Sequence, residues 1–157
     1  MRLTIIKNLA CYTINSKTDC IGVGVIKGRC ECGSVQYEVD GEITDFSHCH
    51  CSQCRRLHGA AFASFGGIPR DKFRYVSGES DLKTYASSEK MDRVFCGNCG
   101  SNILADFKPE PGALYITMGT VDGDPKCPPG YHQFVGSKAP WYEICDDLPR
   151  HDTWPDD

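Results

Sequence analysis

The chain has 157 residues, enough for one domain with a buried core, and its 40% apolar and 24% charged residues are ordinary for a globular protein. The formal net charge is −4 and there is no basic block, so we expect neither nucleic acid nor an anionic membrane as a partner. No apolar run approaches the roughly 20 residues that span a bilayer.

Eleven cysteines are the unusual feature of this composition. In a small secreted protein such a count would indicate a disulfide framework. Here the count is odd, the sequence shows no typical secretory signal, and the cysteines cluster at metal-ligand spacings. We therefore expect reduced cysteines, bound metal and a cytoplasmic location.

Three regions are expected along the chain. Residues 1–26 show no clear relation to the rest of the chain and are predicted to be an N-terminal extension, which is either an extra arm, a poorly ordered tail or a result of a start site placed too far upstream. Residues 27–148 are predicted to form a single zinc-binding domain. Residues 149–157 form an acidic C-terminal tail that we expect to be frayed.

Within the domain the pattern predicts many short strands separated by turn residues, with no internal repeat and no long helical periodicity. The first strand is predicted over residues 33–39, where Val35, Tyr37 and Val39 alternate onto one face. A short helical turn is predicted over 54–58 and a loop over 122–130. The other predicted strands span residues 43–51, 60–66, 73–76, 82–86, 92–96, 103–107, 114–118 and 132–135. The expected fold class is all-β or mostly β.

Two short cysteine motifs, far apart in sequence, could make one closed metal site. They are Cys30-Glu31-Cys32-Gly33 and Cys96-Gly97-Asn98-Cys99-Gly100. Their glycines permit tight turns in which amide N–H groups point at the sulfurs. Together the motifs supply four thiolates, the usual complement of a structural zinc site. The alternative is that Cys30 and Cys32 are only small buried side chains.

A third motif places Cys49, Cys51 and Cys54 in a C-x-C-x-x-C spacing. Along a strand the first two sulfurs share a face, while His48 and His50 point the other way. A helical turn after Cys51 would bring Cys54 to the same point. Three thiolates suit Zn²⁺, but three is one fewer than a closed structural site needs.

The fourth ligand of that site stays open on spacing alone. His58 lies four residues after Cys54 and would share its face of a helical turn. One sulfur could also belong to the four-thiolate site instead. If neither holds, an open three-thiolate zinc is a weak Lewis acid that suits a soft fourth ligand, such as a substrate thiol held as thiolate. The expected chemistry is then at the sulfur of a small thiol. The remaining cysteines suggest no site and are expected to be structural or incidental: Cys11, Cys20, Cys127 and Cys145.

With these motifs in order, the sequence resembles the glutathione-dependent formaldehyde-activating enzyme family, which includes the centromere protein V-like proteins. The resemblance covers about residues 27–145 and does not extend to the first 26. It is carried by the segments Lys27–Gly33, Cys49–Arg56, Phe95–Gly100 and Ser137–Trp141.

The resemblance implies a β-tent, a fold of stacked antiparallel sheets built around zinc sites. It implies two zinc ions per chain, a structural one on Cys30, Cys32, Cys96 and Cys99 and a catalytic one on Cys49, Cys51 and Cys54. It also implies carbon–sulfur lyase chemistry that makes or breaks S-(hydroxymethyl)glutathione, with glutathione and formaldehyde as partners. The alternative function is a non-catalytic zinc-stabilised binding or scaffold module.

Four further residues have open roles. Arg55 and Arg56 could meet a peptide-like carboxylate, or could be solvated surface charges. His132 could lie near the site, although packing in a strand is favoured. Trp141 is expected to be a core or edge aromatic.

Overall fold

The computed structural model of the protein describes residues 24–155, and these fold mostly into β-strands. The first five strands are β1 (Ile26–Arg29), β2 (Gln36–Val39), β3 (Asp45–Cys49), β4 (Ala63–Pro69) and β5 (Phe73–Ser77). The later strands are β6 (Leu82–Ser88), β7 (Met91–Cys96), β8 (Asn102–Phe107), β9 (Ala113–Thr117) and β10 (Tyr131–Gln133). The helical elements are α1 (Ser52–His58) and the 3₁₀ turns Arg70–Lys72, Glu79–Asp81, Met118–Thr120 and Val135–Ser137. No helix in this part of the chain has the length and apolar character to cross a bilayer.

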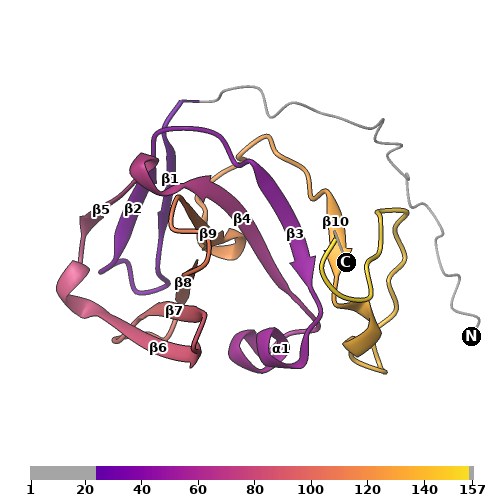
Figure 1. Ribbon diagram of the computed structural model, residues 1–157. Coiled ribbons are helices and arrows are strands. Elements are labelled where there is room, and N and C mark those ends of the chain that lie inside the picture. Colours follow the sequence, from indigo (N-terminus) through magenta and orange to yellow (C-terminus); the bar gives the residue numbers. More distant parts are fainter. Residues whose placement is uncertain (1–23, 156–157) are drawn as a thin grey trace, which may run out of the picture.

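The strands form two sheets. One has three strands in the order β1-β2-β5, and the other has seven in the order β10-β3-β4-β9-β8-β7-β6. Figure 1 shows the sheets leaning together, with β1, β2 and β5 on one side and β3 and β4 on the other. This arrangement confirms the predicted mostly β class with stacked sheets. One pair departs from the antiparallel expectation, because β10 runs parallel to β3.

The main core lies between the sheets. The alternation predicted for β2 is confirmed, since Val35, Tyr37 and Val39 are all at most 1% exposed. They pack with apolar side chains of the larger sheet, among them Ile103 and Ile116. Each fully buried aliphatic side chain contributes about 1.5–3 kcal/mol, so this layer holds the two sheets together.

Both ends of the domain differ from expectation. Residues 1–23 lie outside the described part of the chain, and Ile26, which was assigned to the extension, begins β1 and pairs with Val39. Residues 150–155 are not frayed. The His151 N–H donates to the His132 carbonyl at 2.9 Å, and Trp154 stacks on Phe107 with ring centroids 6.1 Å apart. The acidic composition suggested a solvated tail, but these tertiary contacts fix the segment in place.

Candidate metal centres and the cavity beside them

The structure brings four cysteine sulfurs together across the two sheets. The Sγ atoms of Cys30, Cys32, Cys96 and Cys99 all lie within 4.8 Å of one another. The separation is 3.4 Å for the Cys30–Cys32 pair and 3.8 Å for the Cys32–Cys96 pair. A tetrahedron with Zn–S bonds of about 2.3 Å needs sulfurs about 3.8 Å apart, so this group could hold a zinc ion.

Tight turns supply this geometry. Gly33 and Gly100, which follow the second cysteine of each motif, have φ of +77° and +80°, a conformation that favours glycine. The Val35 N–H donates to the Cys30 sulfur at 3.3 Å. The Glu31 N–H donates to the Ser101 hydroxyl at 3.0 Å and so links the two turns. An N–H that donates to sulfur, as that of Val35 does, stabilises the negative charge of a bound thiolate.

A second group contains the sulfurs of Cys49, Cys51 and Cys54, which also lie within 4.8 Å of one another. Cys49 ends β3, and Cys51 is the N-cap of α1, where its sulfur accepts from the Cys54 N–H at 3.3 Å. The predicted helical turn therefore exists, begins two residues earlier at Ser52, and carries Cys54 to the other two sulfurs. Figure 1 shows α1 at the C-terminal end of β3.

The short distances between these three thiols shift their pKa values in opposite directions. Hydrogen bonds from the Cys49 and Cys54 thiols lower the pKa of Cys51 to about 2. The same contacts with Cys51 and Cys54 raise the pKa of Cys49, and burial raises it further. Three adjacent sulfurs can all carry negative charge only beside a cation, so the donor set suits a soft divalent ion such as zinc.

No fourth protein ligand joins this group within residues 24–155. His58 is not among the side chains within 4.8 Å of the three sulfurs, and its ring packs edge-on against Phe65 with centroids 5.5 Å apart. The seven grouped cysteines also divide into sets of four and three, with no sulfur shared between them. The two alternatives that spacing left open are therefore not favoured.

One buried cation lies beside the three sulfurs. Arg93, on β7, is 7% exposed and donates from Nη2 to the Cys54 sulfur at 3.7 Å. Its guanidinium also lies 5.3 Å from the centroid of the Phe65 ring. Arg93 Nε is buried and has no hydrogen-bond partner among the described residues. The arginine is therefore a charged donor whose Nε–H group can still bind an acceptor.

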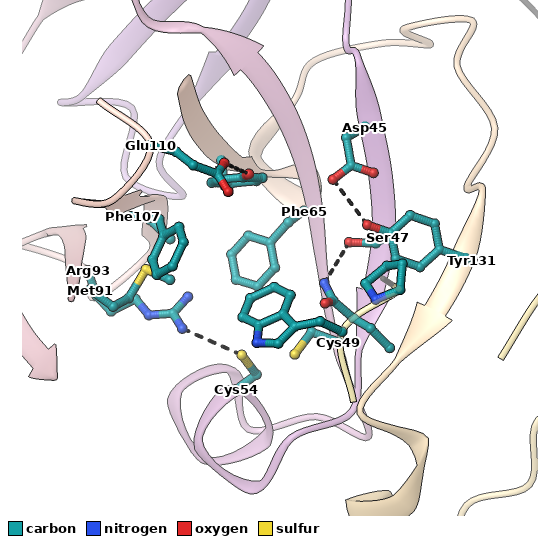
Figure 2. Close-up of a pocket in the computed structure, with 15 residues that line it drawn as sticks. Asp45, Ser47, Cys49, Cys54, Phe65, Met91, Arg93, Phe107, Glu110 and Tyr131 are labelled. Atoms are coloured by element: carbon teal, nitrogen blue, oxygen red, sulfur yellow. Dashed lines mark hydrogen bonds between the residues drawn. The ribbon is translucent and has the colours of Figure 1, made fainter. Parts of the chain in front are cut away.

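A cavity of about 210 Å³ borders this group of sulfurs. Cys49, Cys54 and Arg93 lie at one end of it in Figure 2, and Asp45 and Glu110 lie at the other. The rest of the lining includes Ser47, Phe65, Met91, Ala105, Phe107, Tyr115, Tyr131, Gln133, Trp154 and Pro155. Sequence analysis missed the lining residues other than the cysteines. Strand parity could have found Asp45 and Ser47, which alternate with Cys49 on β3.

The histidines flanking the cysteines face away from the sulfurs, as parity predicted. His50 Nε2 lies 2.8 Å from His132 Nδ1, and His132 Nε2 lies 3.1 Å from the Asp146 carboxylate. His50 and His132 are at most 1% exposed, and burial lowers the pKa of His50 to about 4. His132 thus packs in a strand, where it anchors the chain between Cys49 and Cys51.

The sequence matches a known protein family over most of the described domain. Residues 25–137 match the family described as glutathione-dependent formaldehyde-activating enzyme. The chain belongs to this family. The match includes all seven grouped cysteines and ends before the C-terminal segment that carries Trp154.

The individual proteins that match this chain share less than a third of its residues in the aligned parts. An uncharacterized lyase of Schizosaccharomyces pombe is 31% identical over 62% of this chain and 69% of its own length. A putative glutathione-dependent formaldehyde-activating enzyme of Fusarium vanettenii is 29% identical over 54% of this chain and 46% of its own length. A crystal structure of a Rhodobacter sphaeroides protein is 27% identical, with a TM-score of 0.54 over 62% of this chain and 89% of that one.

The other residues singled out from the sequence lie away from the cavity. Arg55 donates to the His50 and Ser137 carbonyls at 3.3 and 3.2 Å, and Arg56 is exposed on α1. Trp141 is 72% exposed, so its assignment to the core or an edge was wrong. Cys145 is an exposed free thiol, Cys127 packs against the main core, and Cys11 and Cys20 lie outside the described residues.

Proposed function

We propose that this protein is a zinc-dependent enzyme that forms or cleaves the carbon–sulfur bond between a small thiol and a small aldehyde. S-(hydroxymethyl)glutathione, formed from glutathione and formaldehyde, is the representative adduct. Family membership and the names of the relatives, a lyase and a glutathione-dependent formaldehyde-activating enzyme, support an enzymatic role of this kind.

The three-sulfur group beside the cavity is the observation that carries the proposal. Cys49, Cys51 and Cys54 would hold the zinc, and no fourth ligand comes from the described chain. When bound there, zinc supplies a Lewis acid that lowers the pKa of a thiol and keeps it as thiolate. The alternative, a non-catalytic zinc-stabilised module, would gain support from a side chain such as His58 at that position, and His58 does not belong to the group of sulfurs.

In the forward reaction, the sulfur electron pair of the substrate forms the C–S bond to the carbonyl carbon. The carbonyl π pair moves to oxygen, which finally carries the proton from the thiol; cleavage is the reverse. Arg93 is placed to stabilise the negative charge on that oxygen, because its buried Nε has no other acceptor in the described structure. Its positive charge also offsets the net negative charge of three thiolates with one divalent cation. Phe65 and Met91 give the cavity an apolar wall that limits water.

Exchange NMR with ¹³C-formaldehyde and glutathione tests this function. Zinc-loaded protein should accelerate the interconversion of formaldehyde and S-(hydroxymethyl)glutathione above the uncatalysed rate. Cys54→Ser should abolish the acceleration, and Cys145→Ser is the matched control because Cys145 is exposed and belongs to neither group. No acceleration by fully zinc-loaded wild-type protein would reject this substrate pair.

A further inference from the structure

The end of the cavity farthest from Cys54 is negatively charged. Asp45 and Glu110 lie there in Figure 2. Each carboxylate accepts a hydrogen bond from a tyrosine hydroxyl, Asp45 from Tyr131 at 3.1 Å and Glu110 from Tyr115. Neither makes an ion pair with any side chain of residues 24–155, and Arg93, at the sulfur end, is the one cation lining the cavity.

The two carboxylates also disfavour each other. Burial raises the pKa of Asp45, and the charge of Glu110 raises it further, while the bond from Tyr131 acts in the opposite direction. A positively charged group bound between them would relieve both the desolvation and the repulsion. A bound carboxylate with no ammonium beside it would add to both penalties.

A third acceptor lies on the same wall of the cavity. Gln133 is 7% exposed and lines the cavity beside Ser47, to whose hydroxyl its Nε2 donates at 3.0 Å. The other amide atom, Oε1, is buried without a hydrogen-bond partner among the described residues. A buried carbonyl of this kind is completed by a ligand that donates. Gln133 Oε1 therefore also calls for a hydrogen-bond donor, and this observation does not depend on the two carboxylates.

Strand β3 sets the distances between these groups and the sulfurs. Asp45, Ser47 and Cys49 occupy alternate positions and line the same cavity. At about 3.3 Å per residue, Ser47 lies roughly 7 Å and Asp45 roughly 13 Å along the strand from Cys49. A ligand with its sulfur at the cysteine group would therefore meet Gln133 beside Ser47 first, and would have to extend further along the strand to reach Asp45.

We propose that Asp45, Glu110 and Gln133 bind the ammonium group of the thiol substrate. This inference rests on the proposed function and defines the class of thiol that the site takes, one that carries a primary ammonium. The γ-glutamyl end of glutathione carries such an ammonium at a length that suits this span, whereas the ammonium of a short aminothiol stays close to the sulfur. The cavity disfavours thiols whose corresponding end carries no ammonium.

Two matched pairs of thiols test the inference. The first is glutathione against its N-acetyl derivative, blocked at the γ-glutamyl amine, and the second is cysteamine against N-acetylcysteamine. Isothermal titration calorimetry of the zinc-loaded protein gives Kd for all four, and the exchange assay gives kcat/KM. We expect glutathione to bind at least about 10-fold more tightly than its N-acetyl derivative, whereas the cysteamine pair, whose ammonium cannot reach Asp45, should differ little.

Variants separate recognition by these residues from differences between the thiols themselves. Asp45→Asn and Glu110→Gln should each reduce the ratio to about 3-fold or less, with zinc content unchanged. Glu110 is exposed, so its substitution does not endanger folding, and Glu89→Gln is the control because Glu89 is an exposed carboxylate outside the cavity. A ratio near 1 for the glutathione pair, or a ratio that both variants leave intact, would overturn the inference. Binding with the expected ratio but without turnover would instead reject the proposed enzymatic function.

Discussion

At the scale of single residues, Arg93 is the cation that contacts a candidate zinc ligand and also lines the cavity beside it. It is buried, it donates to the Cys54 sulfur, and its Nε has no partner in the described part of the protein. The long side chain comes from β7, about forty residues beyond the cysteines it serves. Nothing in the local sequence around Arg93 marks it as part of the site, because the contact is made only by the pairing of β7 within the sheet.

Replacing this arginine should therefore affect turnover more than zinc binding. We expect Arg93→Gln to lower kcat/KM for formaldehyde and glutathione by about 10²-fold, the usual effect of losing one charged donor at a developing oxyanion. The exchange assay measures this, together with zinc content by elemental analysis. Arg56→Gln is the control, because Arg56 is exposed on α1. Unchanged kcat/KM in a folded, zinc-loaded Arg93→Gln protein would contradict the role given to Arg93.

The seven grouped cysteines could be predicted from the sequence, whereas the acceptors of the cavity could not. Cysteine spacing has local consequences, since strand alternation and one helical turn suffice to bring Cys49, Cys51 and Cys54 together. Gln133 donates to Ser47, 86 positions away in sequence, only because β10 runs parallel to β3. Sequence periodicity reports which face a side chain occupies, but not which strand lies beside it.

At the scale of elements, side-chain hydrogen bonds stabilise the parallel pair β3–β10 in addition to the pairing of its short strands. His132, on β10, bonds both His50 and Asp146 while almost completely buried. The C-terminal segment adds to this edge, because the His151 N–H donates to the His132 carbonyl. The strand that carries Cys49 is thus supported from a region that was expected to be a free tail.

We expect His132→Ala to destabilise the protein by about 2 kcal/mol, since it leaves buried His50 without its partner and opens a gap in the packing. The variant should also retain zinc less well at the three-cysteine group. Urea unfolding and zinc retention during dialysis measure the two effects. Asp146→Asn should cost less, because the Asp146 side chain is 49% exposed. A His132→Ala protein with wild-type stability would show that the chain of hydrogen bonds is not an anchor.

At the scale of the whole molecule, the two cysteine groups have different structural consequences. The four-cysteine group ties the turn after β1 to the turn between β7 and β8, and so joins the two sheets. The three-cysteine group joins only β3 to the adjacent helix α1. A metal in the first should therefore determine folding, and a metal in the second should determine chemistry.

This difference predicts opposite results for cysteine variants. Cys99→Ser should lose much of the folding free energy that a structural zinc supplies, a quantity of about 10 kcal/mol in favourable cases, and should melt far below the wild type. Cys54→Ser should remain folded and lose only one zinc and the activity. Circular dichroism during heating, with zinc analysis of the same samples, measures both. A Cys99→Ser protein that melts like the wild type would contradict the structural role.

The mostly β class could be predicted from the sequence because the strands are short, alternating and separated by turn residues, as in β2. The pairing of the two distant cysteine motifs was also predictable, since a tetrahedral ion needs four donors. The position of residues 150–155 could not be predicted, because their contacts are with strands distant in sequence. Trp154 on Phe107 is one such contact, and it closes a wall of the cavity.

X-ray absorption at the zinc edge, recorded with and without added glutathione, tests the central claim most directly. Four thiolates at one zinc and three at the other predict a mean of about 3.5 sulfur ligands per zinc, rising to about 4 when a thiol binds. A histidine from the chain as the fourth ligand, or a sulfur count that glutathione does not change, would contradict the claim that the three-sulfur zinc accepts its substrate's sulfur.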